Sequence, residues 1–110
     1  MKNSSLFKGL LEPIILQLLK ENKRMYGFEI TQKVKLLTKE ELKITEGALY
    51  PLLHRLEAEG ILEVEMENIG NRIRKYYSLT KMGKKQTAGS IQEVQNFVET
   101  LQILFKPKLV

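Results

Sequence analysis

Apolar residues recur at helical spacing in two segments near the start of the chain. The first segment predicts a helix over residues 11–21, with Pro13 in its first turn, where a missing N–H costs little. Its apolar stripe is Leu11, Ile14, Ile15, Leu18 and Leu19. The second segment predicts a helix over residues 26–37, in which Gly27 permits a close approach of another element. Its inward-facing residues are Ile30, Val34 and Leu37.

A third helix is expected over residues 45–60, because Thr45 is a good N-cap and Gly60 suits a left-handed C-terminal cap. The residues expected to face the core are Leu49, Leu52, Leu53 and Leu56. The residues expected to face outward are Glu46, Gly47, Tyr50, His54 and Arg55. Pro51 conflicts with this helix, since its ring presses on the carbonyl of Gly47. Either the first turn is bent or the regular helix starts after Thr45.

The next segment alternates apolar and polar residues with the period of a β-strand, over residues 62–67 and again over 72–79. Turn-forming residues separate the two runs, so a hairpin is expected; they are Asn68, Gly70 and Asn71. A turn centred on Ile69 and Gly70 would place Glu67 opposite Arg72 and Glu65 opposite Arg74. The two arginines therefore have two interpretations, as cross-strand ion pairs or as contacts to the phosphates of a nucleic acid.

A last helix is predicted from an N-cap at Thr80 to about Phe105. Its apolar residues follow the spacing of a coiled-coil seam: Ile91, Val94, Val98, Leu101 and Phe105, widened by Phe97 and Leu104. At about 1.5 Å per residue this helix spans roughly 37 Å, which is too long to cover a small core by itself. We expect it to pack against its twin and the partner's first helix in a homodimer. An intramolecular core helix is the alternative.

Composition removes several classes of function. The chain has 110 residues, 43% of them hydrophobic, which is enough for one folded domain or a domain with an arm. It has no Cys, no Asp and a single histidine, His54, so no catalytic constellation, metal site or cofactor is expected. No apolar run reaches the roughly 18 residues of a membrane span, so we expect a soluble cytoplasmic protein.

The net charge of +5 is a difference between patches. Residues 68–85 carry six basic residues and no acid, whereas residues 40–67 carry eight glutamates against Lys43 and Arg55. A basic patch of this kind is typical of nucleic-acid binders, although Lys and Arg also cover ordinary solvated faces. The predicted fold is mainly α with a small β hairpin. Residues 1–80 would form a winged helix-turn-helix, and residues 81–110 a long C-terminal dimerisation helix.

Three segments resemble the PadR family of bacterial transcription regulators, over nearly the whole chain. They are KGLLEPIILQLLKENKRMYGFEI, ALYPLLHRLEAEGIL and RKYYSLTKMGKK, of which the last two in succession are the most specific. The length resembles the short subclass, in which one C-terminal helix makes the dimer. The resemblance implies a homodimeric winged-helix repressor that binds a palindromic operator in double-stranded DNA. In some members a hydrophobic or aromatic small molecule at the dimer interface releases the DNA.

The resemblance also assigns residues. The start of the second helix would contact phosphates through Tyr26, Gly27 and Lys33. The third helix would face bases in the major groove through Thr45, Glu46, Gly47, Tyr50 and His54, and the wing would add Arg72, Arg74 and Lys75. Glu46 equally suits the first turn of a helix, and Tyr50 equally suits packing on the second helix.

A candidate effector pocket would combine Phe97, with Phe105 beside it, and the partner's first helix at Leu11, Ile14 and Leu18. Plain core packing is the alternative for these two phenylalanines. The alternative for the whole chain is a winged-helix module for protein contact, without sequence-specific DNA binding, in which the acidic residues 57–67 form the working surface.

Overall fold

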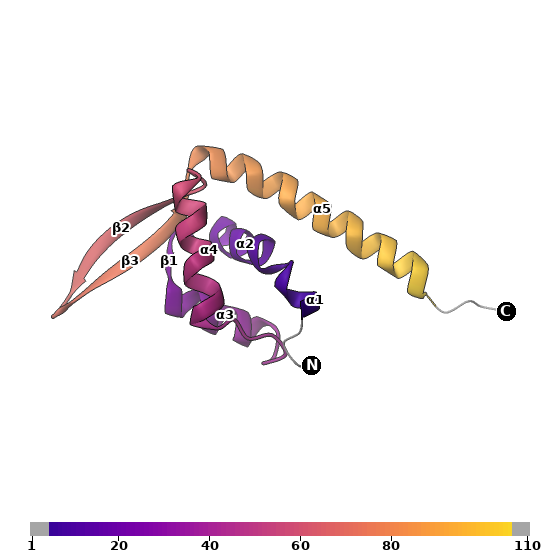
Figure 1. Ribbon diagram of the computed structural model, residues 1–110, viewed down its shortest axis with the longest axis horizontal. Helices are drawn as coiled ribbons and strands as arrows, with labels where there is room; N and C mark the ends of the chain where they lie inside the picture. Colours follow the sequence, from indigo (N-terminus) through magenta and orange to yellow (C-terminus); the bar gives the residue numbers. More distant parts are fainter. Residues whose placement is uncertain (1–4, 107–110) are drawn as a thin grey trace.

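The computed structural model describes residues 5–106, whose elements surround one helical core (Figure 1). The helices are α1 (Ser5–Lys8), α2 (Leu11–Glu21), α3 (Gly27–Leu37), α4 (Glu46–Ala58) and α5 (Lys81–Phe105). The strands are β1 (Met25–Tyr26), β2 (Leu62–Ile69) and β3 (Arg72–Leu79), which form an antiparallel sheet in the order β1-β3-β2. The predicted winged helix-turn-helix with a long last helix is therefore confirmed.

The core lies where α2, α3 and α4 meet the base of the hairpin. Its least accessible side chains are Ile15, Leu16, Ile30, Leu49, Leu53, Leu56, Leu62 and Tyr77. The prediction for Leu37 is wrong, because this last residue of α3 is 60% exposed. The chain leaves the helix there through Lys39 and Glu40, both at positive φ, and returns to the core at Ile44.

The hairpin differs from its predicted register. Its turn is Gly70 and Asn71, with Gly70 at φ +61°, so Ile69 pairs with Arg72 and Glu67 pairs with Arg74. The predicted pairing of Glu67 with Arg72 is wrong by two residues, because the turn lies one residue later in the chain than the predicted turn at Ile69 and Gly70. The tip extends beyond the core, and two of the apolar side chains that it carries, Met66 and Ile73, are exposed.

Helix α4 begins directly after Thr45, whose hydroxyl accepts a hydrogen bond from the N–H of Ala48 at 3.2 Å. It continues through Pro51 to Ala58, so a later start is excluded, and the carbonyl of Gly47 lacks its usual donor. The helix ends in a Schellman motif, in which Gly60 at φ +78° donates to the carbonyl of Glu57 and Ile61 donates to that of Leu56. The predicted caps of this helix are confirmed, and its last helical residue lies two before Gly60.

Helix α5 is anchored at its start and free at its end. The Thr80 hydroxyl donates to the carbonyl of Gly60 at 2.6 Å and accepts from the N–H of Gly83 at 3.0 Å. Gly83 lies so close to the carbonyl of Ile61 that a Cβ there would collide with it. Beyond its contact with α2, the helix projects away from the core on the side opposite the hairpin (Figure 1). Its projecting half exposes Phe97, Val98, Ile103, Leu104 and Phe105.

Candidate nucleic-acid interface

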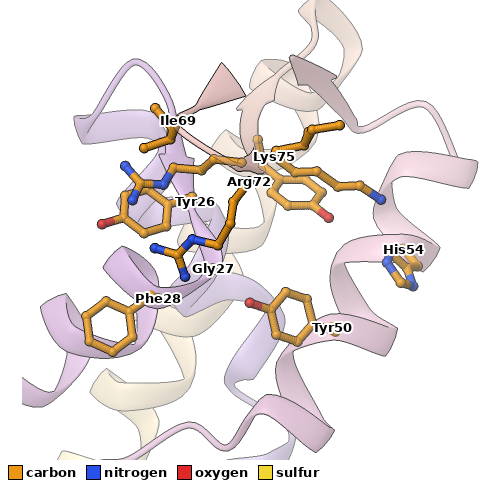
Figure 2. A pocket seen from close by; sticks show the side chains of 11 residues that line it. Tyr26, Gly27, Phe28, Tyr50, His54, Ile69, Arg72 and Lys75 are labelled. Carbon is orange, nitrogen blue, oxygen red and sulfur yellow. The ribbon is translucent and has the colours of Figure 1, made fainter. Parts of the chain in front are cut away.

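A groove of about 650 Å³ lies between α4, the first turn of α3 and the outer part of β3. Figure 2 shows Tyr50 and His54 on the α4 side, with wing side chains across from them. The lining residues are Tyr26, Gly27, Phe28, Tyr50, His54, Ile69, Arg72, Ile73, Arg74, Lys75 and Tyr77. None of them is acidic, and three are permanently basic. The groove therefore offers positive charge, aromatic rings and a helix N-terminus to whatever enters it.

The groove brings together most of the residues predicted to contact DNA: Tyr26, Gly27, Tyr50, His54, Arg72, Arg74 and Lys75. The remaining four lie outside it. Thr45, Glu46 and Gly47 are exposed at the N-terminus of α4, where Thr45 serves as the N-cap. Lys33 on α3 lines a separate hollow, which Arg24 also lines. Phe28 was not predicted, and its ring is 60% exposed on the groove wall.

Tyr50 forms the junction between α4 and α3. A Cβ added at Gly27 would overlap the ring and hydroxyl of Tyr50, so the predicted close approach at Gly27 is confirmed and the approaching group is this side chain. Tyr50 is half-buried and packs against the core, as the alternative interpretation of this residue expected. The contact fixes the angle at which α4 presents its outer face beside α3.

A stack of arginines and tyrosines connects the wing to the start of α3. The rings of Tyr26 and Tyr76, which pair across β1 and β3, meet edge to face at 5.5 Å between centroids. The guanidinium of Arg74 lies 4.0 Å above the Tyr26 ring, and that of Arg24 lies 3.9 Å above the Tyr76 ring. Arg74 also donates to the Tyr76 hydroxyl at 3.3 Å, and this bond raises the pKa of Arg74 above its usual value.

Arg24 forms the ion pairs with Glu65 and Glu67 that the sequence suggested for Arg72 and Arg74. Its Nη1 donates to Glu65 and its Nη2 to Glu67, each at 2.7 Å, and these bonds, the one to Glu67 foremost, raise the pKa of Arg24. Within residues 5–106, Arg72 and Arg74 make no ion pair, so the cross-strand pairing predicted for them is wrong. Strand β1, which follows Arg24, has only two residues and gave no periodic signal.

The basic block of residues 68–85 is not one surface. Arg72, Arg74 and Lys75 lie in the groove, whereas Lys81, Lys84 and Lys85 lie on the first turns of α5. Residues 76–80 separate Lys75 from Lys81, and the four of them that belong to β3 span about 13 Å at roughly 3.3 Å per residue. The groove therefore takes its charge from the wing alone.

Comparison with known proteins identifies the family. Residues 15–89 match the model of the transcriptional regulator PadR-like family. The chain is 31% identical to an uncharacterized protein of Lysinibacillus sphaericus over 107 residues, which cover 96% of this chain and 97% of the relative.

Two solved structures are also similar. A transcriptional regulator from Clostridium thermocellum superposes with a TM-score of 0.85 at 28% identity, covering 96% of this chain and 100% of that one. A PadR-like transcriptional regulator from Bacillus cereus gives 0.80 at 28% identity, with the same coverage. Within residues 5–106, no helix is long and apolar enough to cross a membrane, and no cluster of three metal-ligating side chains occurs. The chain belongs to the PadR-like family of transcriptional regulators.

Proposed function

We propose that this chain is a repressor that binds a palindromic operator as a homodimer. In each copy, the backbone of one DNA strand would lie in the groove between α4 and the wing. The observation that carries this proposal is a groove whose lining has three basic side chains and no carboxylate. A phosphodiester backbone is the polyanion that such a surface attracts most strongly. A neutral or cationic partner would gain no electrostatic attraction from these basic side chains.

The groove and the outward side of α4 have different roles in this proposal. Arg72, Arg74 and Lys75 contact phosphates, beside the start of α3 at Gly27. Such contacts fix position and carry no sequence information. Sequence is read by the outward side of α4 in the major groove, through Glu46, Gly47 and His54.

The second copy is expected on the opposite side of the molecule. An apolar groove of about 390 Å³ lies between α2, the end of α3 and the middle of α5. Its lining includes Leu10, Pro13, Ile14, Leu18, Val34, Leu37, Leu42, Ile91 and Val94. The projecting half of α5 exposes Val98 and Phe105 of the predicted seam with nothing in the described chain to cover them. We propose that each copy's projecting helix packs into this groove of the other, with residues 1–80 binding DNA and residues 81–110 making the dimer.

A hydrophobic or aromatic effector would bind at this same interface. Ile14 and Leu18 line the apolar groove, and Leu11 packs beside them against the core. Phe97 is 55% exposed on the projecting helix and is not part of the lining of this groove, so we expect it to approach these residues from the partner. An effector held there would change the distance between the two α4 helices, and with it the match to two half-sites.

The competing function, protein contact through the acidic residues 57–67, receives less support. Arg24 pairs with Glu65 and Glu67, and Arg55 pairs with Glu59, so these carboxylates are engaged within the chain. The proposed function is tested by sequencing the genomic DNA fragments that the purified protein retains. We expect an inverted repeat with half-sites one helical turn apart, about 34 to 36 Å, or a multiple of this. Retention of fragments without a shared motif would contradict it.

A further inference from the structure

We propose that Arg24 is a positioning residue for DNA binding, which occupies Glu67 and thereby leaves Arg74 free to contact a phosphate. Arg24 lies outside the groove and would not touch the DNA backbone there. This inference rests on the proposed function and adds a residue that acts through another.

Glu67 is the natural partner of Arg74. The two residues lie directly opposite each other on β2 and β3, so their side chains share one face of the hairpin. Directly opposite side chains of opposite charge are close enough to pair. In the structure, however, Glu67 accepts a hydrogen bond of 2.7 Å from Arg24, and Arg74 has no carboxylate partner in the described chain.

Two contacts hold Arg24 in this competing position. Its second guanidinium nitrogen donates to Glu65 at 2.7 Å, which makes the arginine a bridge between two carboxylates of β2. Its guanidinium also lies 3.9 Å above the ring of Tyr76. A planar guanidinium satisfies two carboxylates and a ring face at once, which a lysine ammonium does not.

Tyr76 links the two arginines. One face of its ring carries Arg24, and its hydroxyl accepts a hydrogen bond from Arg74 at 3.3 Å. Arg74 then lies 4.0 Å above Tyr26, which puts its guanidinium among the groove-lining groups. Arg24 lines the hollow on the other side of Tyr26, with Glu29 and Lys33. The same aromatic pair thus separates an arginine that pairs with the carboxylates of the wing from one that faces the groove.

Removal of Arg24 would change both the charge beside Arg74 and the direction in which the Arg74 side chain points. Glu65, Glu67 and Arg24 together carry one net negative charge, whereas the two carboxylates alone carry two, beside Arg74. Glu67 would then attract Arg74 away from Tyr26, and one phosphate contact would be lost.

The test measures affinity for operator DNA over a salt series. We expect Arg24→Ala to weaken binding by about five- to tenfold at low salt and to lower the slope of log K against log salt by about one, the loss of one phosphate contact. Arg24→Ala/Glu67→Gln should regain most of the affinity and the slope. Arg24→Ala/Arg74→Ala should bind no more weakly than Arg74→Ala alone.

The matched control is Arg55→Ala, which also removes an arginine that pairs with two glutamates, Glu12 and Glu59, but one that is not part of the groove lining. It should retain the wild-type slope. Wild-type slope in Arg24→Ala, failure of Glu67→Gln to rescue it, or additive losses with Arg74→Ala would each overturn the inference. These results would leave the proposed function intact, whereas a wild-type protein without salt-dependent DNA binding would overturn both. Thermal melting of every variant identifies one that loses affinity by unfolding, and the rescue by Glu67→Gln excludes that cause.

Discussion

The ring of Tyr50 on α4 lies against the Cα of Gly27 on α3, at a distance that leaves no room for a Cβ. We expect Gly27→Ala to reduce the free energy of unfolding by about 1 to 3 kcal/mol, because the added methyl group overpacks a half-buried contact. Urea unfolding followed by circular dichroism measures this change. Operator affinity should fall as well, since displaced Tyr50 changes the angle of α4.

Gly89→Ala is the control for this substitution. Gly89 also lies in a helix, but a Cβ there meets nothing within 4 Å. Alanine at an exposed helical position is about 0.5 to 1 kcal/mol more favourable than glycine, so this variant should be slightly more stable than the wild type. Equal destabilisation by the two substitutions would contradict the proposed contact between Tyr50 and Gly27.

Thr80 joins the C-terminal end of α4 to α5 through its hydroxyl, which bonds both to the carbonyl of Gly60 and to the N–H of Gly83. Thr80→Val keeps the shape and removes both bonds, and it should cost about 1 to 2 kcal/mol of unfolding free energy. Thr100→Val removes a hydroxyl bond from an exposed turn of the same helix, to the carbonyl of Asn96. That variant should change stability much less in the same denaturation experiment.

The parts of the fold with strong local signals were predictable from the sequence. Helical spacing predicted α2, α3 and α4, and the caps at Thr45, Gly60 and Thr80 were all correct. The hairpin register was not predictable, because Asn68, Gly70 and Asn71 allow more than one turn, and the observed one depends on Gly70 at positive φ.

The ion-pair partners of the charged side chains were also not predictable from the sequence. Arg24 meets Glu65 and Glu67 from 41 and 43 residues away, through a strand of two residues that has no periodic pattern. Sequence spacing predicted nearer partners for these carboxylates. The exposure of Leu37 and Met66 likewise depends on where the core ends in space. Both residues continue the apolar pattern of their elements, so the pattern does not show that they lie beyond the core.

The division between wing and recognition helix gives a further prediction. Lys75→Ala should weaken binding to operator and random DNA by a similar factor, because Lys75 contacts phosphates only. His54→Ala, on the exposed side of α4, should mainly reduce the preference for operator. Lys84→Ala removes the same charge from the start of α5, outside the groove, and should leave both affinities nearly unchanged. Fluorescence anisotropy with the two duplexes measures all three, and a change of sequence preference by Lys75→Ala would reverse these roles.

A substitution in the projecting half of α5 tests the proposed dimer. Val98 is 45% exposed in the chain, so Val98→Glu leaves the monomer fold intact but would bury a charge in the interface with the second copy. We expect a monomer by light scattering at micromolar concentration, with unchanged helical content. Gln92→Glu on the outward side of α5 should stay dimeric. A dimeric Val98→Glu protein would show that the interface lies elsewhere.

The most direct test of the DNA-binding groove is the salt dependence of operator affinity in the wild type and in Arg72→Ala. Arg72 lies at the wing tip, is exposed, and makes no ion pair within residues 5–106. A groove that holds a DNA backbone predicts a steep linear fall of log K with log salt in the wild type, and a slope about one smaller in the variant. A flat salt dependence, or the same slope in both proteins, would contradict the assignment of this groove to DNA.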